Sequence, residues 1–552
     1  MTDPTTAATS SPTSASPPTV AHAVVAALRA AGVRRVHGVP GEDHLRLLHA
    51  IDEGGLEYIA ARDESAAGVM ATAEAQFTGV PGVLLVTPAP GITNAINGIA
   101  SAALDHVPLI VIVGQHAPER RPVIVRQNLD NHALLAPLVK WSATLGPRVH
   151  QVMAKVLDTA LLGDPGPVLV ELRDDVAKLA PLDTASEWPI HAPASAIVAR
   201  AGVAAPLREA LASARRPVVL VGGRGRSAEV GAGVSAFVEA ARAPVFTTPS
   251  AKGAVAHDSR WLAGTFLNGN LEDAIIGRAD LIVGVGLDAG DIFNGAWRHS
   301  IPFIALEPDP LRVQHFFPTS TLILGELSCL LDEARPAGSP SEWAPAEVTA
   351  YRESISERFI DPDPNGTLTI PAGIADARSV LPDDTLVTVD AGFGKPLMSM
   401  LWDARIANAY VSSQGLSTMG YAIPAANALK LVAPGRTVVG FLGDGSLLMR
   451  ASEISVAAAH GIAPIYIVWV DGSLSQIEVK QLRQDLRNVG VQFAPPSCAA
   501  IAAAFGGTGH DVTTRAEFRE VLRAALGASG PVLIGVRVDQ ARRGEWFESL
   551  RG

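Results

Sequence analysis

Two acidic residues in the C-terminal third of the chain have types and spacing that suit a divalent cation beside a phosphate. Asp444 lies in the loop Gly443-Asp444-Gly445-Ser446, which follows an apolar run typical of a strand and precedes a stretch typical of a helix. Asp471 follows the apolar run IYIVWV, one strand–helix–strand unit further on. Such a unit places successive strand ends side by side in a parallel sheet. One or two carboxylates beside a phosphate-accepting, glycine-rich loop are the usual elements of a Mg²⁺ site.

The pattern of the whole chain indicates three blocks that would position such a site. In each block, short β-branched runs bounded by Gly or Pro alternate with amphipathic helical stretches. This alternation is typical of α/β domains with a doubly wound parallel sheet. We expect a disordered tail at residues 1–18, an N-terminal domain at 19–183, a central Rossmann-like domain at 195–335 and a C-terminal domain at 350–545.

A short phrase is shared by the first and third blocks. Gly166-Pro167-Val168-Leu169 and Gly530-Pro531-Val532-Leu533 each begin an expected strand near the end of a block. The repeat suggests related units, although four common residues can also match by chance.

Composition and charge exclude several classes of function. The 552 residues carry 44 Lys+Arg against 55 Asp+Glu, a net charge of −11. Such a chain has no electrostatic reason to bind nucleic acid or an anionic membrane. Its two cysteines, Cys329 and Cys498, lie too far apart in sequence to indicate a disulfide framework. With no signal-peptide pattern and no long apolar run, we expect a cytoplasmic protein without a membrane span.

The spacing of the two acids resembles the diphosphate-binding motif of thiamin-diphosphate (ThDP) enzymes. That family usually has Asn at the position of Asp471, and an acid there remains a competent ligand for a hard cation. The resemblance implies ThDP and Mg²⁺ as cofactors. It implies Asp444, Asp471 and the backbone carbonyl of Ser473 as metal ligands.

Further phrases extend the resemblance to acetolactate synthases. In SSQGLSTMGYAIPAA (412–426), Met419 matches the Met that holds ThDP in its V shape. Ser417 stands where the family usually has Gly, and its carbonyl would accept from the 4′-amino group. By the same resemblance, the remaining cofactor-binding residues are Pro90, Asn94, Ala391, Gly392, Gly443, Gly445, Ser446, Leu474 and Ser475.

The catalytic acid implied by the resemblance is Glu64. The phrase Ala61-Arg62-Asp63-Glu64-Ser65-Ala66-Ala67 is similar to the family's R-H-E-x-x-A, with Asp63 in place of His. The stretches 84–100 and 105–115 match two further family phrases. The alternative for an isolated Glu at a helix start is a first-turn acid that interacts with the helix dipole.

By the same resemblance, four more residues are candidates for the substrate pocket. They are Glu42, Arg126, Gln127 and Glu478. Arg126 could pair with a substrate carboxylate. The alternatives are a helix cap for Glu42, a surface salt bridge for Arg126, a turn position for Gln127 and a solvated helix face for Glu478.

The resemblance implies decarboxylation of a 2-oxo acid, pyruvate by default, with carboligation to a second carbonyl compound, as in acetolactate synthase. A non-ligating decarboxylase or an aldehyde lyase of the same superfamily is the main alternative. A nucleotide-dependent oxidoreductase that uses the glycines of VGGRGR (221–226) and a catalytically inactive homologue are two others. FAD is possible but not favoured, because the central phrases of the FAD-binding synthases are altered here. The family arrangement also implies a homodimer or homotetramer.

Overall fold

The computed structural model describes residues 18–120, 122–123, 125–190, 201–292, 295–310, 316–361, 363 and 366–551. The predicted disordered tail at 1–18 lies outside these residues except for its last position, and so does the segment 191–200. Three six-stranded sheets account for the strands, and every pairing within them is parallel. The expectation of an α/β fold with three doubly wound parallel sheets is therefore confirmed.

The first sheet belongs to the N-terminal part of the chain. Its strand order is β2 (Glu57–Ala60), β1 (Arg35–Gly38), β3 (Gly82–Val86), β4 (Leu109–Gln115), β6 (Pro167–Arg173) and β5 (Trp141–Thr144). The accompanying helices are α1 (Val20–Ala30), α2 (Leu45–Glu53), α3 (Glu64–Thr78), α4 (Gly91–Leu104), α5 (Asn131–Leu135), α6 (Val149–Leu161) and α7 (Asp174–Ala177), with a 3₁₀ turn η1 (Glu42–His44). Strands β3 and β4 are buried along their whole length, as expected for a sheet with helices on both faces.

The third sheet repeats the strand order of the first. It runs β14 (Tyr410–Ser412), β13 (Leu386–Val389), β15 (Val438–Gly443), β16 (Ile465–Val470), β18 (Val532–Arg537) and β17 (Thr508–Val512). Its helices are α13 (Ile370–Val380), α14 (Gly394–Leu401), α15 (Ala422–Val432), α16 (Asp444–Arg450), α17 (Ile454–Ala459), α18 (Ser475–Arg483), α19 (Cys498–Ala504), α20 (Arg515–Ala525) and α21 (Arg543–Arg551), with a 3₁₀ turn η6 (Ala451–Glu453). The shared Gly-Pro-Val-Leu phrase lies at the start of β6 and of β18, which occupy the same place in the two sheets.

The second sheet has a different order, β12 (Thr319–Leu324), β11 (Phe303–Glu307), β10 (Leu281–Val285), β7 (Pro217–Val221), β8 (Val245–Thr247) and β9 (Leu262–Thr265). Its helices are α8 (Ala205–Ser213), α9 (Ala228–Ala241), α10 (Asp273–Ile276) and α11 (Leu327–Ala334), with 3₁₀ turns η2 (Gly223–Gly225), η3 (Pro249–Ala251) and η4 (Ala289–Asp291). Helix α12 (Pro345–Phe359) packs against β9 at the edge of this sheet, so the expected start of the third domain at residue 350 falls inside a helix.

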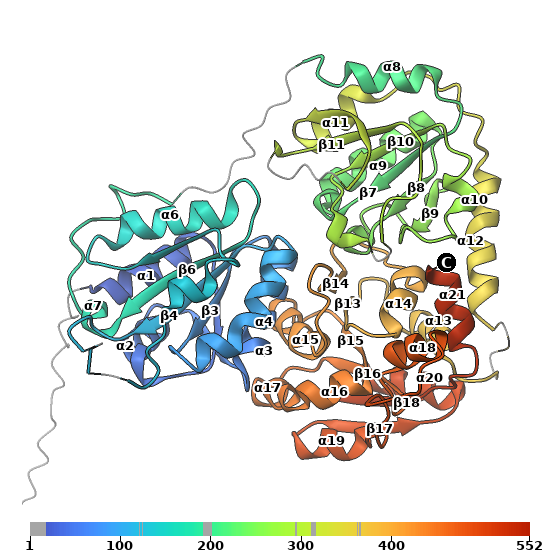
Figure 1. Cartoon of the computed structure of the whole chain (residues 1–552). Coiled ribbons are helices and arrows are strands. Elements are labelled where there is room, and N and C mark those ends of the chain that lie inside the picture. The colour runs from blue at the N-terminus through green and yellow to red at the C-terminus, as the bar shows by residue number, and fades with distance from the viewer. Residues whose placement is uncertain are drawn as a thin grey trace, which may run out of the picture.

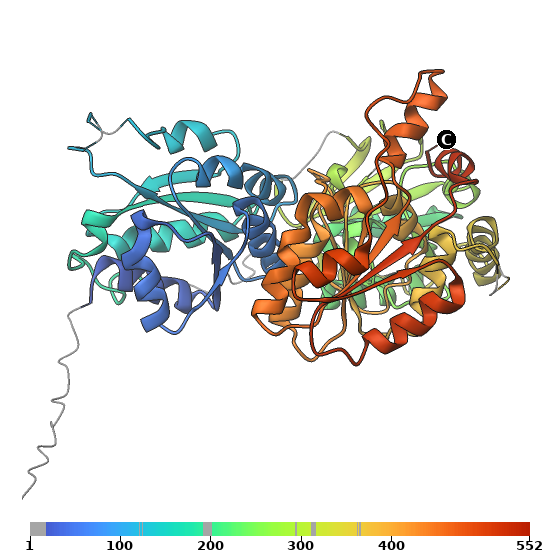
Figure 2. The same cartoon turned by 90° about the horizontal axis from the view of Figure 1, so that it is seen from below.

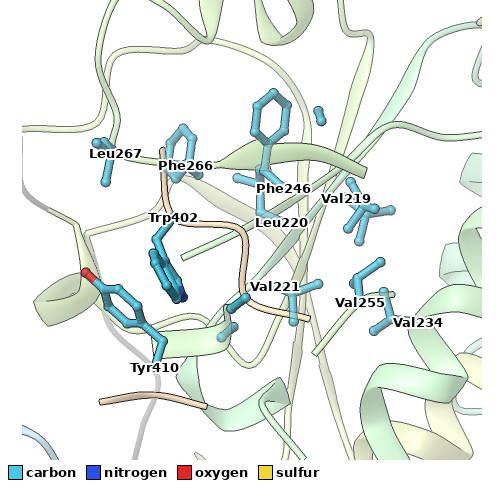
Figure 3. Packing of buried hydrophobic residues seen from close by; sticks show 14 of the residues in the cluster. Val219, Leu220, Val221, Val234, Phe246, Val255, Phe266, Leu267, Trp402 and Tyr410 are labelled. Atoms are coloured by element: carbon cyan, nitrogen blue, oxygen red, sulfur yellow. The ribbon is translucent and has the colours of Figure 1, made fainter. Parts of the chain in front are cut away.

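The three sheets are held together by two hydrophobic cores that cross between them. One core joins the second and third sheets, and Figure 3 shows Trp402 and Tyr410 of the third in the same cluster as Phe246 and Phe266 of the second. The other joins the first and third, where α3 and α4 face α15 (Figure 1). Seen from below, the first domain lies beside the stacked second and third (Figure 2).

Small residues make the contact between α3 and α4 possible. A Cβ on Gly68 would lie 3.0 Å from the Cα of Gly98, and one on Gly98 would lie 2.7 Å from the Cα of Gly68. Only glycine at both positions lets the two helices approach this closely. This contact fixes the start of α3, where the candidate catalytic acid lies.

Candidate active site

A cavity of about 300 Å³ opens at the carboxyl ends of β13, β15 and β16. It is lined by every residue of the C-terminal domain that the sequence assigns to the cofactor. These are Ala391, Gly392, Ser417, Met419, Gly443, Asp444, Gly445, Ser446, Asp471, Ser473, Leu474 and Ser475. The parallel sheet therefore brings together side chains from four separate stretches of sequence, at the edge where ligands of open α/β sheets bind.

Asp444 begins α16 and ties the ends of two neighbouring strands together. Its Oδ2 accepts hydrogen bonds from the backbone N–H of Asp471 at 3.0 Å and of Gly472 at 2.7 Å. Its Oδ1 accepts from the N–H of Gly445 at 2.9 Å. Burial raises the pKa of the Asp444 carboxyl, and these three N–H groups oppose the rise. The carboxylate is thus held in a fixed orientation beside Asp471.

Asp471 lies at the end of β16, across from Asp444. Its Oδ1 accepts from the N–H of Ser473 at 3.0 Å, and its Oδ2 accepts from the hydroxyl of Ser475. Burial raises the pKa of Asp471 to about 6, and the nearby carboxylate of Asp444 adds to the rise. Two carboxylates held this close favour a bound cation, which would stabilise their charged forms.

The residues present fit ThDP and Mg²⁺. Two carboxylates and the carbonyl of Ser473 are oxygen ligands of the kind that Mg²⁺ prefers. No cluster of three His, Cys, Asp or Glu side chains is found among the described residues, so an all-side-chain metal cage is not what this region offers. A Cβ added to Gly392 or Gly443 would meet nothing within 4 Å, which leaves open space in front of both loops for a diphosphate.

Asp390 is a site residue that the sequence reasoning missed. It follows β13 and is buried in the same cavity wall. Its Oδ1 accepts from the N–H of Gly420 at 2.9 Å and from the hydroxyl of Ser446 at 3.0 Å, and its Oδ2 accepts from the N–H of Ala422. Burial raises the pKa of Asp390 to about 6. An acid directly after a buried strand, as at Asp444 and Asp471, is the signal that could have found it.

The N-terminal candidates form a second group. Glu64 is the first residue of α3, and its Oε2 accepts from the side-chain amide of Asn94 at 3.1 Å. Pro90 directly precedes α4 in the same region. Asp63, which replaces the family's His, caps α3 by accepting from the N–H of Ala66 at 3.1 Å.

The structure does not bring this second group to the cavity of the same chain. Neither Glu64 nor Asn94 lines it, and Glu64 is only half-buried. The start of α3 is instead held against the chain's own C-terminal domain, where the N–H of Arg62 donates to Glu453 at 3.0 Å and Arg450 lies 3.4 Å from Asp63. One chain therefore presents two separate half-sites.

Of the four candidates for the substrate pocket, three are exposed and one is buried. Glu42 lies in η1 and is exposed, and Arg126 and Gln127 are exposed in the stretch between β4 and α5. Glu478 is buried in α18 but does not line the cavity, whereas its neighbours Gln476 and Ile477 do. The sequence reasoning did not single out these two neighbours.

The side chain of Glu478 is fully engaged elsewhere. It pairs with Arg543 at 2.9 Å and accepts from Asn488 at 2.9 Å, from Gln492 at 3.3 Å and from the hydroxyl of Ser473. Burial would raise the pKa of Glu478, but these hydrogen bonds outweigh it and hold the pKa below its usual range. Glu478 thus supports the loop that carries Ser473.

The glycine-rich turn of the second sheet already holds an internal anion. The N–H of Gly223 donates to the buried carboxylate of Asp291 at 2.9 Å, and the hydroxyls of Thr248 and Ser250 donate to the same group. Arg224 in this turn pairs with Glu307 and Asp288. A protein carboxylate occupies the position where a dinucleotide phosphate would be expected.

Comparisons with known proteins agree over the length of the chain. Residues 18–134, 205–333 and 391–536 match the N-terminal, central and C-terminal domains of thiamine pyrophosphate enzymes. An acetolactate synthase large subunit from Parasynechococcus marenigrum is 30% identical, with 95% of this chain and 88% of the relative covered. A probable 2-ketoarginine decarboxylase from Pseudomonas aeruginosa is 29% identical, with 95% of both chains covered.

A solved structure shows the same fold. The ThDP-dependent 4-hydroxybenzoylformate decarboxylase from Rhodococcus jostii aligns with a TM-score of 0.83 at 24% identity, over 95% of this chain and 99% of that one. The matches to all three domains and the 30% identity to the synthase large subunit show that the chain belongs to the thiamine pyrophosphate enzyme family, within its branch of 2-oxo-acid decarboxylases and carboligases.

Proposed function

We propose that the protein is a ThDP- and Mg²⁺-dependent enzyme that decarboxylates a 2-oxo acid and joins the product to a second carbonyl compound, as acetolactate synthases do. The observation that carries the proposal is the single cavity that gathers the acid pair, the glycine loops and Met419. Pyruvate is the default donor. When bound, ThDP would supply a nucleophilic carbon and an electron sink for decarboxylation.

Each half-site has its own task in this proposal. Asp444, Asp471 and the carbonyl of Ser473 would hold Mg²⁺ and, through it, the diphosphate. Met419 lies against the glycine loop, with its Cε 3.4 Å from the position of a Cβ on Gly445, so it can support a bent cofactor. Glu64 would hold a proton at N1′ of the aminopyrimidine.

We further propose that the complete site forms between two copies of the chain. The half-site of Glu64 and that of Asp444 do not meet within one copy. Large apolar side chains are exposed in both domains, namely Val123, Val125 and Leu129 after β4 in the first. In the third domain they are Leu448 and Met449 on α16, which begins at Asp444, and Ile477 in the cavity wall. Exposed apolar groups around an incomplete site are what an oligomer interface needs. A homodimer is the minimum, and a tetramer would contain the same pair.

A simple decarboxylase is the second candidate. It is supported by the relatedness to a probable 2-ketoarginine decarboxylase, whose sequence is as similar as those of the synthases. A nucleotide-dependent oxidoreductase is less well supported, because Asp291 already occupies the glycine turn of the second sheet. For the same reason, we do not expect FAD to bind at the glycine turn of the second sheet. We also propose that the protein is cytoplasmic.

Product analysis separates these candidates. The protein, loaded with ThDP and Mg²⁺, is incubated with pyruvate, longer 2-oxo acids and 2-ketoarginine, each with and without an aldehyde acceptor, and the products are identified by mass spectrometry. The proposal expects a ligated 2-hydroxyketone product from at least one donor. Aldehyde and CO₂ alone from every donor would make the decarboxylase the correct reading.

A further inference from the structure

Ser417 adopts a backbone conformation that its residue type disfavours. Its φ is 53°, in the left-handed region that L side chains rarely enter, and ThDP enzymes usually have Gly at this position. The carbonyl of Ser417 is the expected acceptor for the 4′-amino group of ThDP, so its direction depends on this conformation. Something in this chain must hold it in place.

A buried lysine contacts the side chain of Ser417. Lys395 lies in the first turn of α14 and is only 3% exposed, and it lines the cofactor cavity. Its Nζ donates to the hydroxyl of Ser417 at 3.1 Å and to the backbone carbonyl of Ser413. The ammonium group of Lys395 is therefore hydrogen-bonded to both ends of the loop 413–417.

Asp105 of the first domain also forms hydrogen bonds with this loop. The Oδ1 of Asp105 accepts from the N–H of Gln414 at 2.9 Å and from the N–H of Gly415 at 2.6 Å. Burial lowers the pKa of Lys395 to about 8, while Asp105 and Asp390 oppose the fall, so the ammonium keeps its charge at neutral pH. A charged donor makes the stronger kind of hydrogen bond.

We propose that Lys395 is a positioning residue that keeps Ser417 in its left-handed conformation, and thereby aims the Ser417 carbonyl at the aminopyrimidine of ThDP. The inference rests on ThDP being the cofactor. It predicts that the hydroxyl of Ser417 matters only because the residue is not glycine, which can adopt positive φ without support.

The alternative is that Lys395 acts directly on the cofactor's negative charge or only stabilises the fold. Substitutions at Ser417 distinguish these roles, because Ser417→Ala removes the contact and keeps the strained conformation, whereas Ser417→Gly removes the contact and the strain together. Lys252 is a matched control. It is also buried, and its Nζ bonds to Thr265 and to the carbonyl of Ser399, both at 2.8 Å, away from the cofactor cavity.

The test measures the dissociation constant of ThDP at saturating Mg²⁺ by calorimetry, with the melting temperature of each free protein as a check on folding. Lys395→Met and Ser417→Ala should each weaken binding about tenfold, the value of a hydrogen bond to a charged group. Ser417→Gly should bind more tightly than Ser417→Ala, and Lys395→Met/Ser417→Gly more tightly than Lys395→Met. Lys252→Met should bind like the parent protein.

An analogue of ThDP that lacks the 4′-amino group provides the second arm. With no 4′-amino group to receive, the parent protein and Ser417→Ala should bind this analogue equally. Equal ThDP affinity in the parent, Ser417→Ala and Ser417→Gly would overturn the inference, as would a tenfold loss in Lys395→Met that Ser417→Gly leaves unrepaired. Absence of ThDP binding by the parent protein would instead count against the proposed function.

Discussion

The first and third sheets have the same strand order but carry different chemistry at the same strand ends. In the third sheet, Asp390, Asp444 and Asp471 follow β13, β15 and β16 directly. The equivalent strands β1, β3 and β4 of the first sheet are followed by Val39, Thr87 and His116. The first domain places its acid, Glu64, on a helix start beside the sheet instead. One topology thus supplies a row of three acids at the sheet edge of one domain, which we propose binds the cation, and a single acid at a helix start in the other.

The difference also separates binding from chemistry. Asp390 and Asp444 are buried, Asp471 is half-buried, and all three carboxylates accept hydrogen bonds from neighbouring backbone, as a rigid binding site requires. Glu64 is also half-buried, and its hydrogen-bond partner is the side-chain amide of Asn94. We infer that the third domain retains the cofactor and that the first acts on it. Variants that affect only one domain should therefore have distinct signatures.

The largest effect on cofactor binding is expected at the metal edge. Asp444→Ala should weaken Mg²⁺-dependent ThDP binding by at least about 100-fold, because even outer-shell partners of metal sites are worth 10–100-fold. Asp471→Asn should retain binding, because the amide oxygen remains a ligand and Asn is the residue that the family usually has. Both are measured by the rise in melting temperature on adding ThDP and Mg²⁺. Equal shifts in Asp444→Ala and the parent protein would show that the diphosphate is not held at this edge.

Glu64→Gln should have the opposite signature. The amide preserves the shape of the side chain but cannot take up a proton, so turnover should fall about 10²–10⁴-fold, the usual value of a positioned acid or base. The thermal shift with ThDP and Mg²⁺ should stay close to that of the parent protein. Full activity in this variant would refute the assigned role of Glu64.

The smallest effect is expected where the two domains meet within one chain. Burial raises the pKa of Glu453 to about 7 from an ordinary value of 4.5, although the N–H of Arg62 donates to it. Because the folded state holds this proton more tightly than the unfolded chain, the contribution of Glu453 to stability is fully present below about pH 4.5 and is lost as the pH rises to about 7.

Glu453→Gln keeps a hydrogen-bond acceptor for the N–H of Arg62 and removes the fall in unfolding free energy that ionisation of Glu453 causes. We expect the variant to gain at most about 3 kcal/mol of unfolding free energy above neutral pH, and little at low pH. Chemical denaturation over a pH series measures it. A gain of the same size at both ends of the series would show that titration of Glu453 is not the cause.

The predictable part of the site is the part that local sequence determines. Asp444 and Asp471 each follow a recognisable apolar strand, and the parallel topology then brings them together. The position of Glu478 outside the cavity of its own chain has a simple geometric origin. Successive residues of α18 point about 100° apart, so a shift by one or two positions moves a side chain from the cavity, where Gln476 and Ile477 lie, to the partner Arg543.

Contacts between residues far apart in the chain could not be predicted from the sequence. Two examples are the hydrogen bond from Lys395 to Ser417 and the hydrogen bond from the N–H of Gln414 to Asp105. Both depend on how α14 and the first domain pack, which no local sequence pattern encodes. The separation of Glu64 from the cavity of its own chain, in contrast, is consistent with the oligomeric arrangement that the family resemblance implies. Among the described residues, the helices lack a hydrophobic stretch of the length needed to span a lipid bilayer.

In the proposed assembly, the first domain of one copy completes the site of the third domain of another. Co-expression of Glu64→Gln with Asp444→Ala tests it most directly, because each variant alone lacks one half-site. The mixed preparation should regain about a quarter of the parent activity, since about half of randomly paired dimers contain one intact site of two. A mixed preparation that assembles into hybrid dimers but stays as inactive as the separate variants would contradict the claim.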